Sequence, residues 1–489
     1  MAFTTKSDYM KHTFIPLLLA VILFSCQNKQ VAPPTKQDTS SKSFEIHANK
    51  RAGIQAAANQ TPQVIVQADT TLKDGTRSLL LKVVIPGATP PKDTTPTTPP
   101  VPPVDTANRI AGIGINTLPW VPLEKLTMFS TVRLYVASGW IWRPGGLFVQ
   151  PMYQAETEYA HGIDDYLYRA KALGIDVLPC VNQTPDWHNG YSQGIGSNDY
   201  PPIKPGADRK DPKSYADYAE FWYQFVCRYG SKVHPDADLR VDVTPRWNND
   251  VRNVKKSGLN LIKAVEVNNE VGRWWDKGTD KDAAYMHPEE FAAMMAAVYQ
   301  ACKRADPNIK VIMGGTTNFE LPYIKAMKAK FDQLGVPFQS DAINIHHYSS
   351  LFNEKGKHPP TWKNSSACLP SEDKDFSTIY EVVAYGKSLG LQTWVTEFGC
   401  DSKKESWMHI DGSRMGMSNE DAQGKLLVEN YKAYFAAGVT RCYAFMAADE
   451  PGSNGGLWQT SGLLRNKSNG WQEKPAWYAV KNYVQSLKK

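Results

Sequence analysis

Three features of other protein classes are missing from this chain of 489 residues. The formal net charge is only +6, and no cluster of Lys and Arg with interleaved aromatic residues occurs, so nucleic acid is not an expected partner. The seven cysteines show no CxxC spacing, so we expect no zinc site and no other metal or cofactor. Beyond the N-terminal segment, no apolar run is long enough to cross a membrane.

The N-terminus has the pattern of an export signal. Two lysines precede an apolar core at residues 14–24. The core ends in Leu23-Phe24-Ser25-Cys26, which resembles the lipobox of bacterial lipoproteins. That resemblance implies cleavage before Cys26, lipidation of this cysteine, and an exported protein anchored at the outer membrane or cell surface. The alternative is an ordinary signal peptide with an incidental cysteine, but the polar composition of residues 27–50 favours a lipid-anchored tether.

Six cysteines remain after the proposed lipid anchor. They are Cys180, Cys227, Cys302, Cys368, Cys400 and Cys442. An exported protein could pair them, and six cysteines allow 15 connectivities. Several lie in expected strands or helices, where a cysteine is often a small core residue, so both readings stay open.

A Pro/Thr-rich linker at residues 88–106 divides the chain. Such a segment is extended and semi-rigid and cannot build a core. Before it, Gln63–Val66 and Ser78–Ile85 have strand-like composition and are separated by the turn Lys73-Asp74-Gly75. We therefore predict a signal peptide at residues 1–25, a tether with a short β element and linker at 26–107, and one globular domain at 108–489.

Within the globular part, apolar strand-like runs alternate with helical patterns, which is typical of a parallel α/β sheet. Eight runs qualify: Ile110–Ile115, Thr131–Val136, Asp176–Val181, Leu261–Val267, Lys310–Gly314, Ala342–His346, Thr393–Thr396 and Thr440–Phe445. Amphipathic helices are expected at residues 215–228, 291–304, 421–437 and 476–487. Eight strands in alternating order predict a (β/α)₈ TIM barrel.

Two of the expected strands lead to a glutamate. Residues 264–270 read AVEVNNE and residues 393–399 read TWVTEFG, so the glutamates are Glu270 and Glu397. A buried strand that delivers a carboxylate to its C-terminal tip is how a barrel presents catalytic residues. Two carboxylates facing one pocket are the minimum equipment for hydrolysing a glycosidic bond. Glu266 has the same side-chain parity as Glu270 but lies deeper, so we interpret it as a buried structural residue.

Other strand tips carry polar or aromatic residues that would line the same cleft. The candidate substrate-binding residues are Asn116, Arg133, Trp187, Asn269, His346, Tyr348 and Trp458. On the sixth strand, His346 shares parity with Tyr348, so both should face the cleft while His347 points to the far side. Each tryptophan could instead be ordinary packing.

The motif set resembles the retaining glycoside hydrolases of clan A. The resemblance rests on Asn269-Glu270 after strand four, His346-His347-Tyr348 after strand six and Glu397 after strand seven. Three further segments resemble glycoside hydrolase families 39 and 5: Arg228-Tyr229-Gly230, Ala305-Asp306-Pro307-Asn308 and Lys474-Pro475-Ala476-Trp477-Tyr478. One position departs from family 39, which tends to have an aromatic residue where this chain has Asn268.

The resemblance implies a role for each residue of the motif. Glu270 would be the general acid/base and Glu397 the nucleophile, with Tyr348 donating a hydrogen bond to Glu397. Asn269 would bind the sugar hydroxyl beside the reacting carbon. Arg133 is our candidate for the cation that keeps Glu397 ionised. Double displacement through a glycosyl-enzyme intermediate would place the two carboxyl groups about 5–5.5 Å apart.

We therefore expect a lipid-anchored, monomeric retaining β-glycosidase that acts on oligo- or polysaccharides outside the cytoplasm. One alternative is a barrel that binds glycans without cleaving them, although such a protein has little use for two costly carboxylates at strand tips. Another is a metal-dependent barrel hydrolase, which would want a His-x-His or clustered carboxylates on one strand, and the sequence has neither. The sugar, the linkage and the choice between chain ends and internal bonds stay open.

Overall fold

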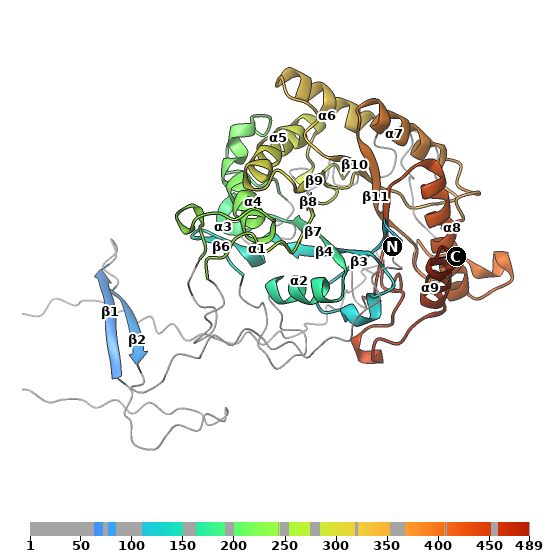
Figure 1. Ribbon diagram of the computed structural model, residues 1–489, viewed down its shortest axis with the longest axis horizontal. Helices are drawn as coiled ribbons and strands as arrows, with labels where there is room; N and C mark the ends of the chain where they lie inside the picture. The colour runs from blue at the N-terminus through green and yellow to red at the C-terminus, as the bar shows by residue number, and fades with distance from the viewer. Residues whose placement is uncertain are drawn as a thin grey trace, which may run out of the picture. The chain divides into compact units, whose positions relative to one another are not determined.

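The computed structural model divides into two units, residues 1–94 and 95–489. It describes residues 63–71, 77–84, 110–149, 163–190, 200–242, 244, 254–273, 284–317, 321–352, 367–404, 406, 408–450 and 458–488. The signal segment, Cys26 and the Pro/Thr-rich linker lie outside this range. In the first unit, β1 (Gln63–Thr71) and β2 (Arg77–Val84) pair antiparallel, which confirms the two expected strands (Figure 1).

The second unit is built around eight parallel strands. They are β3 (Ile113–Thr117), β4 (Thr131–Ala137), β7 (Asp176–Asn182), β8 (Ala264–Val267), β9 (Lys310–Met313), β10 (Ala342–His346), β11 (Gln392–Phe398) and β12 (Arg441–Ala444). Their order is β10-β11-β12-β3-β4-β7-β8-β9. A bridge between Thr316 and Ile345 and a 2.6 Å hydrogen bond from the His346 amide to the Thr316 carbonyl link the two ends of this order. The sheet is therefore a nearly closed barrel of the TIM type.

Helices surround the strands (Figure 1). The longer ones are α2 (Ile163–Ala172), α4 (Ala216–Tyr229), α5 (Pro288–Ala305), α6 (Leu321–Gln333), α7 (Ser377–Ser388), α8 (Asn419–Ala437) and α9 (Pro475–Ser486). Short elements are α1 (Ser138–Ile141), α3 (Asp186–Asn189), β5 (Trp142–Arg143), β6 (Gly146–Leu147) and the 3₁₀ turns Leu123–Leu126, Pro212–Tyr215, Asp236–Asp238, Gly412–Met415 and Lys467–Asn469. The four helices expected from the sequence are all present.

Local sequence explains where the helices form and stop. In α4, Tyr218, Trp222 and Phe225 recur at helical spacing and are all buried. At the start of α8, the Ser418 hydroxyl accepts a 3.1 Å hydrogen bond from the Asp421 amide, which satisfies one of the first free N–H groups. The helix ends at Gly438, whose φ of 96° suits a residue without a side chain.

The barrel interior is filled by side chains rather than being a pore. Leu178, Ala264, Ile312, Ala342, Trp394 and Tyr443 form one buried cluster contributed by six strands. The ring of Tyr443 requires a glycine at position 114 of the neighbouring strand, because a Cβ at Gly114 would lie 2.4 Å from the Tyr443 ring. The larger apolar cluster includes residues of both strands and surrounding helices, as expected for parallel strands that are buried on both faces.

The first barrel strand begins later than predicted. It starts at Ile113 instead of Ile110, because Gly112 adopts a φ of 89° and turns the chain before the strand. A Cβ at Gly112 would also lie 2.3 Å from the Thr440 carbonyl oxygen, so close backbone packing favours glycine there.

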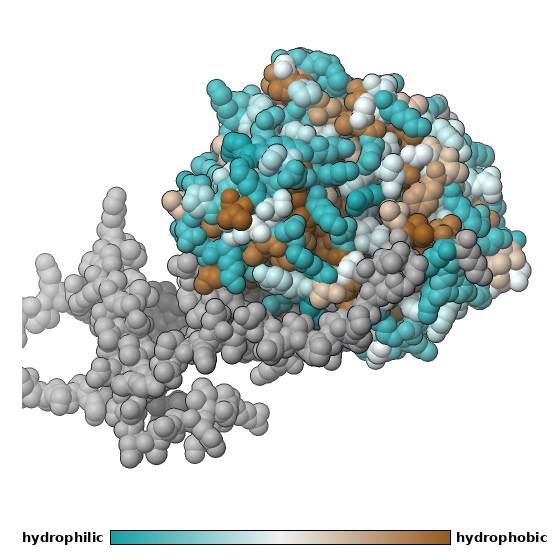
Figure 2. Space-filling model, in the orientation of Figure 1, coloured by the Kyte–Doolittle hydropathy of each residue, from teal (hydrophilic) through white to brown (hydrophobic). Residues whose placement is uncertain are grey.

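Each of the six remaining cysteines is buried with a free thiol. They therefore act as small core residues, and the disulfide alternative is not realised in the structure. Figure 2 shows a mostly hydrophilic face of the molecule with smaller hydrophobic patches. Among the described residues, no helix has both the length and the apolar character required to cross a membrane.

Candidate active site

Glu397 lies near the C-terminal end of β11 and is held by donors on both oxygens. Its Oε1 accepts a 2.8 Å hydrogen bond from Arg133 and another from the Tyr135 hydroxyl. Its Oε2 accepts a 2.8 Å hydrogen bond from the Tyr348 hydroxyl. The side chain is only 7% exposed, so these donors rather than water solvate the carboxylate. The neighbours that the sequence suggested for Glu397, Arg133 and Tyr348, are both in place.

The surroundings of Glu397 favour its ionised form. Burial by itself would raise the pKa of this carboxyl, but His346, Arg133 and the hydroxyls of Tyr135 and Tyr348 outweigh burial and lower the pKa. Burial, with nearby carboxylates, raises the pKa of Tyr348 well above its ordinary value, so its hydroxyl stays protonated and can donate a hydrogen bond to Glu397. An ionised, oriented carboxylate is the form that a nucleophile requires.

Glu270 follows β8 and has a different environment. Its side chain is 18% exposed, and Oε1 lies 2.7 Å from Nδ1 of His346. Asn268 and Glu270 have positive φ values of 68° and 46°, so the chain leaves the strand in a left-handed conformation. Asparagine tolerates this conformation better than an aromatic residue does, which accounts for Asn268 at a position where family 39 tends to have one.

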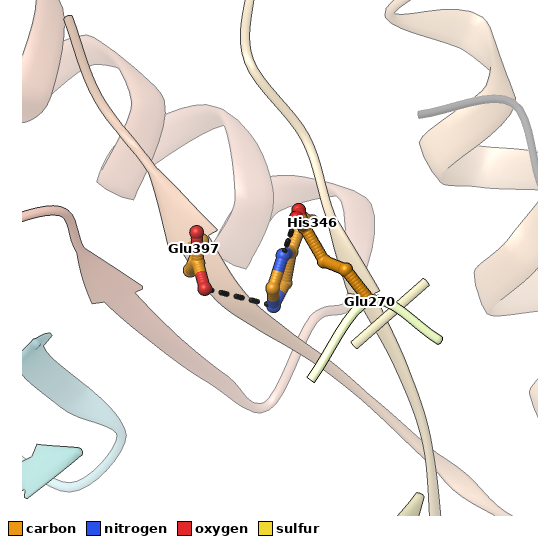
Figure 3. A group of neighbouring side chains, drawn as sticks. All are labelled: Glu270, His346 and Glu397. Atoms are coloured by element: carbon orange, nitrogen blue, oxygen red, sulfur yellow. Dashed lines mark hydrogen bonds and ion pairs between the residues drawn. The ribbon is translucent and has the colours of Figure 1, made fainter. Parts of the chain in front are cut away.

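His346 lies between the two glutamates (Figure 3). Its Nε2 is 3.4 Å from Oε1 of Glu397, and the three side chains bring one atom each within 4.8 Å of one another. The predicted orientation of the adjacent histidines is confirmed, because His347 instead lies 2.9 Å from the Tyr434 hydroxyl and 3.3 Å from Asp373.

A buried ion pair between Arg133 and Glu266 supports the site. Arg133 contacts Glu266 through Nε at 2.6 Å and through Nη2 at 2.9 Å, and both side chains are inaccessible to solvent. The same guanidinium donates to the side-chain oxygens of Asn116 at 2.7 Å and Asn269 at 2.6 Å. The two charges of the pair compensate each other and leave further donors of Arg133 to orient Glu397.

The predicted substrate-binding residues do not all lie in the same place. Arg133 and Asn116 are both fully buried: Arg133 donates to Glu397, and Asn116 accepts a hydrogen bond from Arg133. Direct substrate contact by either residue stays a prediction. Trp187 in α3 is 44% exposed, and its indole N–H donates to the Trp142 carbonyl at 3.3 Å. Its described ring contacts are with Trp142 and His188, so its link to the carboxylate pair also stays a prediction.

Aromatic rings form an arc around Glu397. Trp458 lies 4.6 Å from Tyr348 and 5.4 Å from Phe445, measured between ring centroids. Phe445 in turn lies 6.4 Å from Tyr135, so the arc begins and ends at the two tyrosines that donate to Glu397. Flat apolar faces beside a reactive carboxylate suit the C–H faces of a sugar ring.

Tyr135, Thr396 and Phe445 are residues of the site that were missed in the sequence. Tyr135 shares strand parity with Arg133, and this signal alone could have pointed to it. Thr396 neighbours Glu397 and should face away from the cleft, yet its hydroxyl lies 3.1 Å from His346 Nε2. The pairing register of β11 shifts around this point, and an irregularity of this kind is not visible in the hydrophobic pattern.

The proximity of Glu270, His346 and Glu397 raises the question of a metal ion. The geometry argues against it, because the two ring nitrogens of His346 face different carboxylates and one ion cannot bind both nitrogens. Arg133 also lies 2.8 Å from Glu397 and would repel a cation there. The arrangement is better suited to proton transfer between acids and bases than to metal coordination.

The comparison with solved structures agrees with this fold. No protein-family model matches the chain, and no curated protein sequence matches it. The structure is similar to a family 39 glycoside hydrolase from Bacteroides cellulosilyticus WH2, with 15% identity, a TM-score of 0.51, and coverage of 85% of this chain and 68% of that chain. It is also similar to a monomeric beta-xylosidase from Caulobacter crescentus CB15, with 16% identity, a TM-score of 0.45, and coverage of 77% of this chain and 70% of that chain. The chain therefore shares a (β/α)₈ barrel fold with a family 39 glycoside hydrolase.

Proposed function

We propose that this protein is a retaining β-glycosidase that hydrolyses O-glycosidic bonds of oligo- or polysaccharides by double displacement. The observation that carries the proposal is a pair of strand-tip carboxyls with different hydrogen-bond partners and exposure, and with an oxygen of each within 4.8 Å of the other. Retaining enzymes place their carboxyl groups about 5–5.5 Å apart, whereas inverting enzymes need about 6.5–9.5 Å to admit a water molecule. The fold shared with a family 39 glycoside hydrolase agrees with this assignment.

In the first step, Glu397 attacks the anomeric carbon while Glu270 gives its proton to the departing oxygen. A covalent glycosyl-enzyme results, and the leaving group is released as an alcohol. In the second step, Glu270 takes a proton from water, which attacks the same carbon and frees Glu397. The donors around Glu397 favour its ionised form, and the more exposed Glu270 can reach both the leaving group and water.

A carbohydrate substrate is supported by the polar and aromatic groups beside the carboxyls. The Asn269 side chain is held by Arg133 at 2.6 Å, which leaves its amide N–H₂ as a donor for the hydroxyl next to the reacting carbon. Trp458 and Phe445 offer flat faces for the sugar ring. A glycan-binding barrel without activity is less consistent with a carboxylate that is buried, ionised and held by three side-chain donors.

Membrane anchoring through Cys26 is a separate proposal that rests on the N-terminal sequence. We expect a mature, monomeric protein that starts at a lipidated Cys26 and lies at the outer membrane or cell surface. Metabolic labelling with palmitate in a bacterial host should label the wild type and not Cys26→Ala, and the variant should move to the soluble fraction. Equal labelling of both forms would contradict the anchor.

Activity is tested on a panel of polysaccharides and nitrophenyl β-glycosides with wild type, Glu270→Gln and Glu397→Gln. General acid–base catalysis contributes about 10²–10⁴-fold, so Glu270→Gln should lose that much on substrates with poor leaving groups. Glu397→Gln should be inactive on all of them. Proton NMR of the first product should show the starting anomeric configuration. Full activity of both variants, or an inverted first product, would refute the proposal.

A further inference from the structure

His346 is the described residue that contacts both proposed catalytic carboxyls. Its side chain is 1% exposed, with Nδ1 at 2.7 Å from Glu270 Oε1 and Nε2 at 3.4 Å from Glu397 Oε1 (Figure 3). Substrate contact was the role expected from the sequence. The burial and the two carboxyl contacts instead suggest that the imidazole acts on the catalytic groups themselves.

The partners of Nε2 indicate that this nitrogen carries a proton. Nε2 faces the Glu397 carboxylate and, at 3.1 Å, the Thr396 hydroxyl oxygen. The hydroxyl hydrogen of Thr396 is directed to Glu266 Oε1 at 3.3 Å, and this oxygen belongs to a carboxylate paired with Arg133. The Thr396 oxygen therefore presents a lone pair to the imidazole. A bare Nε2 would face two acceptors, so hydrogen-bond pairing requires an N–H there.

Glu270 must carry a proton to act as the acid, and this requirement determines whether Nδ1 of His346 is protonated. Because Glu270 Oε1 is turned toward His346, the proton for the leaving group must reside on Oε2. With the proton on Oε2, Oε1 is a carbonyl oxygen that can only accept, so Nδ1 must donate. Both ring nitrogens then carry hydrogen and the ring is an imidazolium.

We infer that His346 is a doubly protonated positioning residue that balances charge in both half-reactions of the proposed glycosidase. This inference rests on the proposed function. The cluster around the two carboxyls has four charged groups in the free enzyme. Glu266 and Glu397 are negative, and Arg133 and His346 are positive, while Glu270 is a neutral acid. Tyr135, Tyr348 and Thr396 contribute neutral hydroxyls. The cluster as a whole is neutral.

The charge remains balanced when the reaction proceeds. An oxygen of Glu397 bonds to the anomeric carbon, the bond from that carbon to the leaving oxygen breaks, and the proton on Glu270 moves to that oxygen. Glu397 becomes a neutral ester and Glu270 becomes a carboxylate, so one negative charge has moved from the Nε2 side of the imidazolium to the Nδ1 side. The second half-reaction returns it. A fixed cation between the two groups stabilises both states without reorganisation.

Gly315 holds the ring in this position. A Cβ at Gly315 would lie 2.1 Å from Nε2 and 2.2 Å from Cδ2 of His346, so the glycine backbone lies against the imidazole. Gly315→Ala should displace the ring without removing any titratable group. The variant therefore distinguishes the effect of moving the His346 ring from the effect of removing a histidine.

NMR of the full chain with ¹⁵N-labelled histidine tests the protonation state directly, with His346 assigned through His346→Asn. We expect two ring N–H groups on His346 at neutral pH in the free protein. A single ring N–H would overturn the inference. This readout needs no substrate, so it stands even if the panel reveals no glycosidase activity.

Kinetics test the double role with whichever nitrophenyl or alkyl β-glycoside the wild type cleaves. His346→Asn, His346→Gln and Gly315→Ala should each lower kcat/KM at least about 100-fold while thermal unfolding stays cooperative. His234→Asn is the control, because His234 is a buried histidine beyond the end of α4 that bonds to the Ala305 carbonyl at 2.7 Å. It should stay within threefold of wild type.

The choice of leaving group distinguishes an effect of His346 on Glu270 from an effect on Glu397. An activated nitrophenolate leaves without a proton, so a loss transmitted through Glu270 alone would disappear with that substrate. A loss that persists supports action on Glu397 as well, and a loss that disappears would overturn the double role. Wild-type kinetics in the His346 variants, with Glu397→Gln inactive and Glu270→Gln impaired on substrates with poor leaving groups, would overturn the inference and leave the proposed function standing.

Discussion

At the scale of single residues, the central feature is that two glutamates of the same barrel rim have different environments. Glu397 is 7% exposed and is held by three hydrogen-bond donors, whereas Glu270 is 18% exposed and bonds to His346. Pairs of titratable groups whose environments differ in this way divide acid and base roles between them. The division here favours Glu397 as the ionised partner.

Removal of one donor should be visible in the pH dependence of activity. Tyr348→Phe deletes the hydroxyl 2.8 Å from Glu397 Oε2. Because hydrogen bonds to the charged form lower the pKa of a carboxyl, their loss should raise the pKa of Glu397. The acid limb of kcat/KM should therefore move to higher pH. Hydrogen bonds to charged groups contribute about 1.5–3 kcal/mol, so kcat/KM at the optimum should fall about tenfold or more.

Tyr434→Phe is the matched control for this experiment. It removes a buried hydroxyl that donates to the His347 carbonyl at 3.0 Å and lies next to the His347 ring, which faces away from the carboxylate pair. Its acid limb should coincide with that of wild type. An unchanged acid limb in Tyr348→Phe would contradict the role of Tyr348 as a donor to Glu397.

At the scale of elements, the segment after β12 is held in place by buried charges. Asp401, just beyond β11, accepts hydrogen bonds from the backbone amides of Trp458 at 2.7 Å and Thr460 at 2.8 Å. Nearby, the buried Lys474 lies 3.1 Å from Asp449 and 2.9 Å from the Thr460 carbonyl. These contacts fix the segment that presents Trp458 to Tyr348, so an aromatic ring of the cleft depends on groups outside it.

Asp449 should make the stability of the protein depend on pH. Burial outweighs Lys474 and raises the pKa of Asp449 from 3.8 to about 6, so the folded state binds this proton more tightly than the unfolded state. The stabilising contribution is complete below about pH 4 and is lost as pH rises through about 6. It amounts to a free energy of unfolding on the order of 3 kcal/mol. Urea unfolding of wild type and Asp449→Asn at pH 4 and pH 7 measures it.

The expected result is a difference between the two proteins that changes with pH in this window. Asp411→Asn is the control, since Asp411 lies in an exposed turn and its pKa is lowered, mainly by the Ser413 hydroxyl. It titrates below the window and should give no such change. A pH-independent difference between wild type and Asp449→Asn would contradict the account of Asp449.

The sequence predicted the elements better than it predicted their contacts. All eight strands follow from local apolar runs, and the deeper position of Glu266 along the strand that leads to Glu270 separated a buried glutamate from one at the rim. The register shift in β11 that places Thr396 beside His346 depends on pairing with neighbouring strands. The contact of Lys474 with Asp449 joins residues that are 25 positions apart in the sequence. Long-range packing sets both features, so no local pattern reveals them.

At the scale of the whole molecule, the candidate site belongs to one unit. The described contacts of Glu270, His346 and Glu397 come from residues of the barrel strands and their tips, within residues 95–489. The β hairpin of the first unit is joined to the barrel through the Pro/Thr-rich linker.

A protein consisting of residues 108–489 should therefore fold and keep its activity. We expect kcat and KM within about twofold of the full chain on the same nitrophenyl glycoside, because no described side chain of the site precedes residue 108. Steady-state kinetics and thermal unfolding of both forms measure this. A large loss of kcat in a truncated protein that still unfolds cooperatively would mean that the N-terminal unit contributes to the site.

The most direct test of the central claim is to trap the glycosyl-enzyme. A 2-deoxy-2-fluoro glycoside of the sugar that the wild type cleaves, with an activated leaving group, slows the second step more than the first and lets the intermediate accumulate. Mass spectrometry of the digested protein should find one fluoroglycosyl group per molecule, attached to Glu397, and none in Glu397→Gln. Label on another residue, or no label on a wild type that hydrolyses the parent glycoside, would contradict Glu397 as the nucleophile.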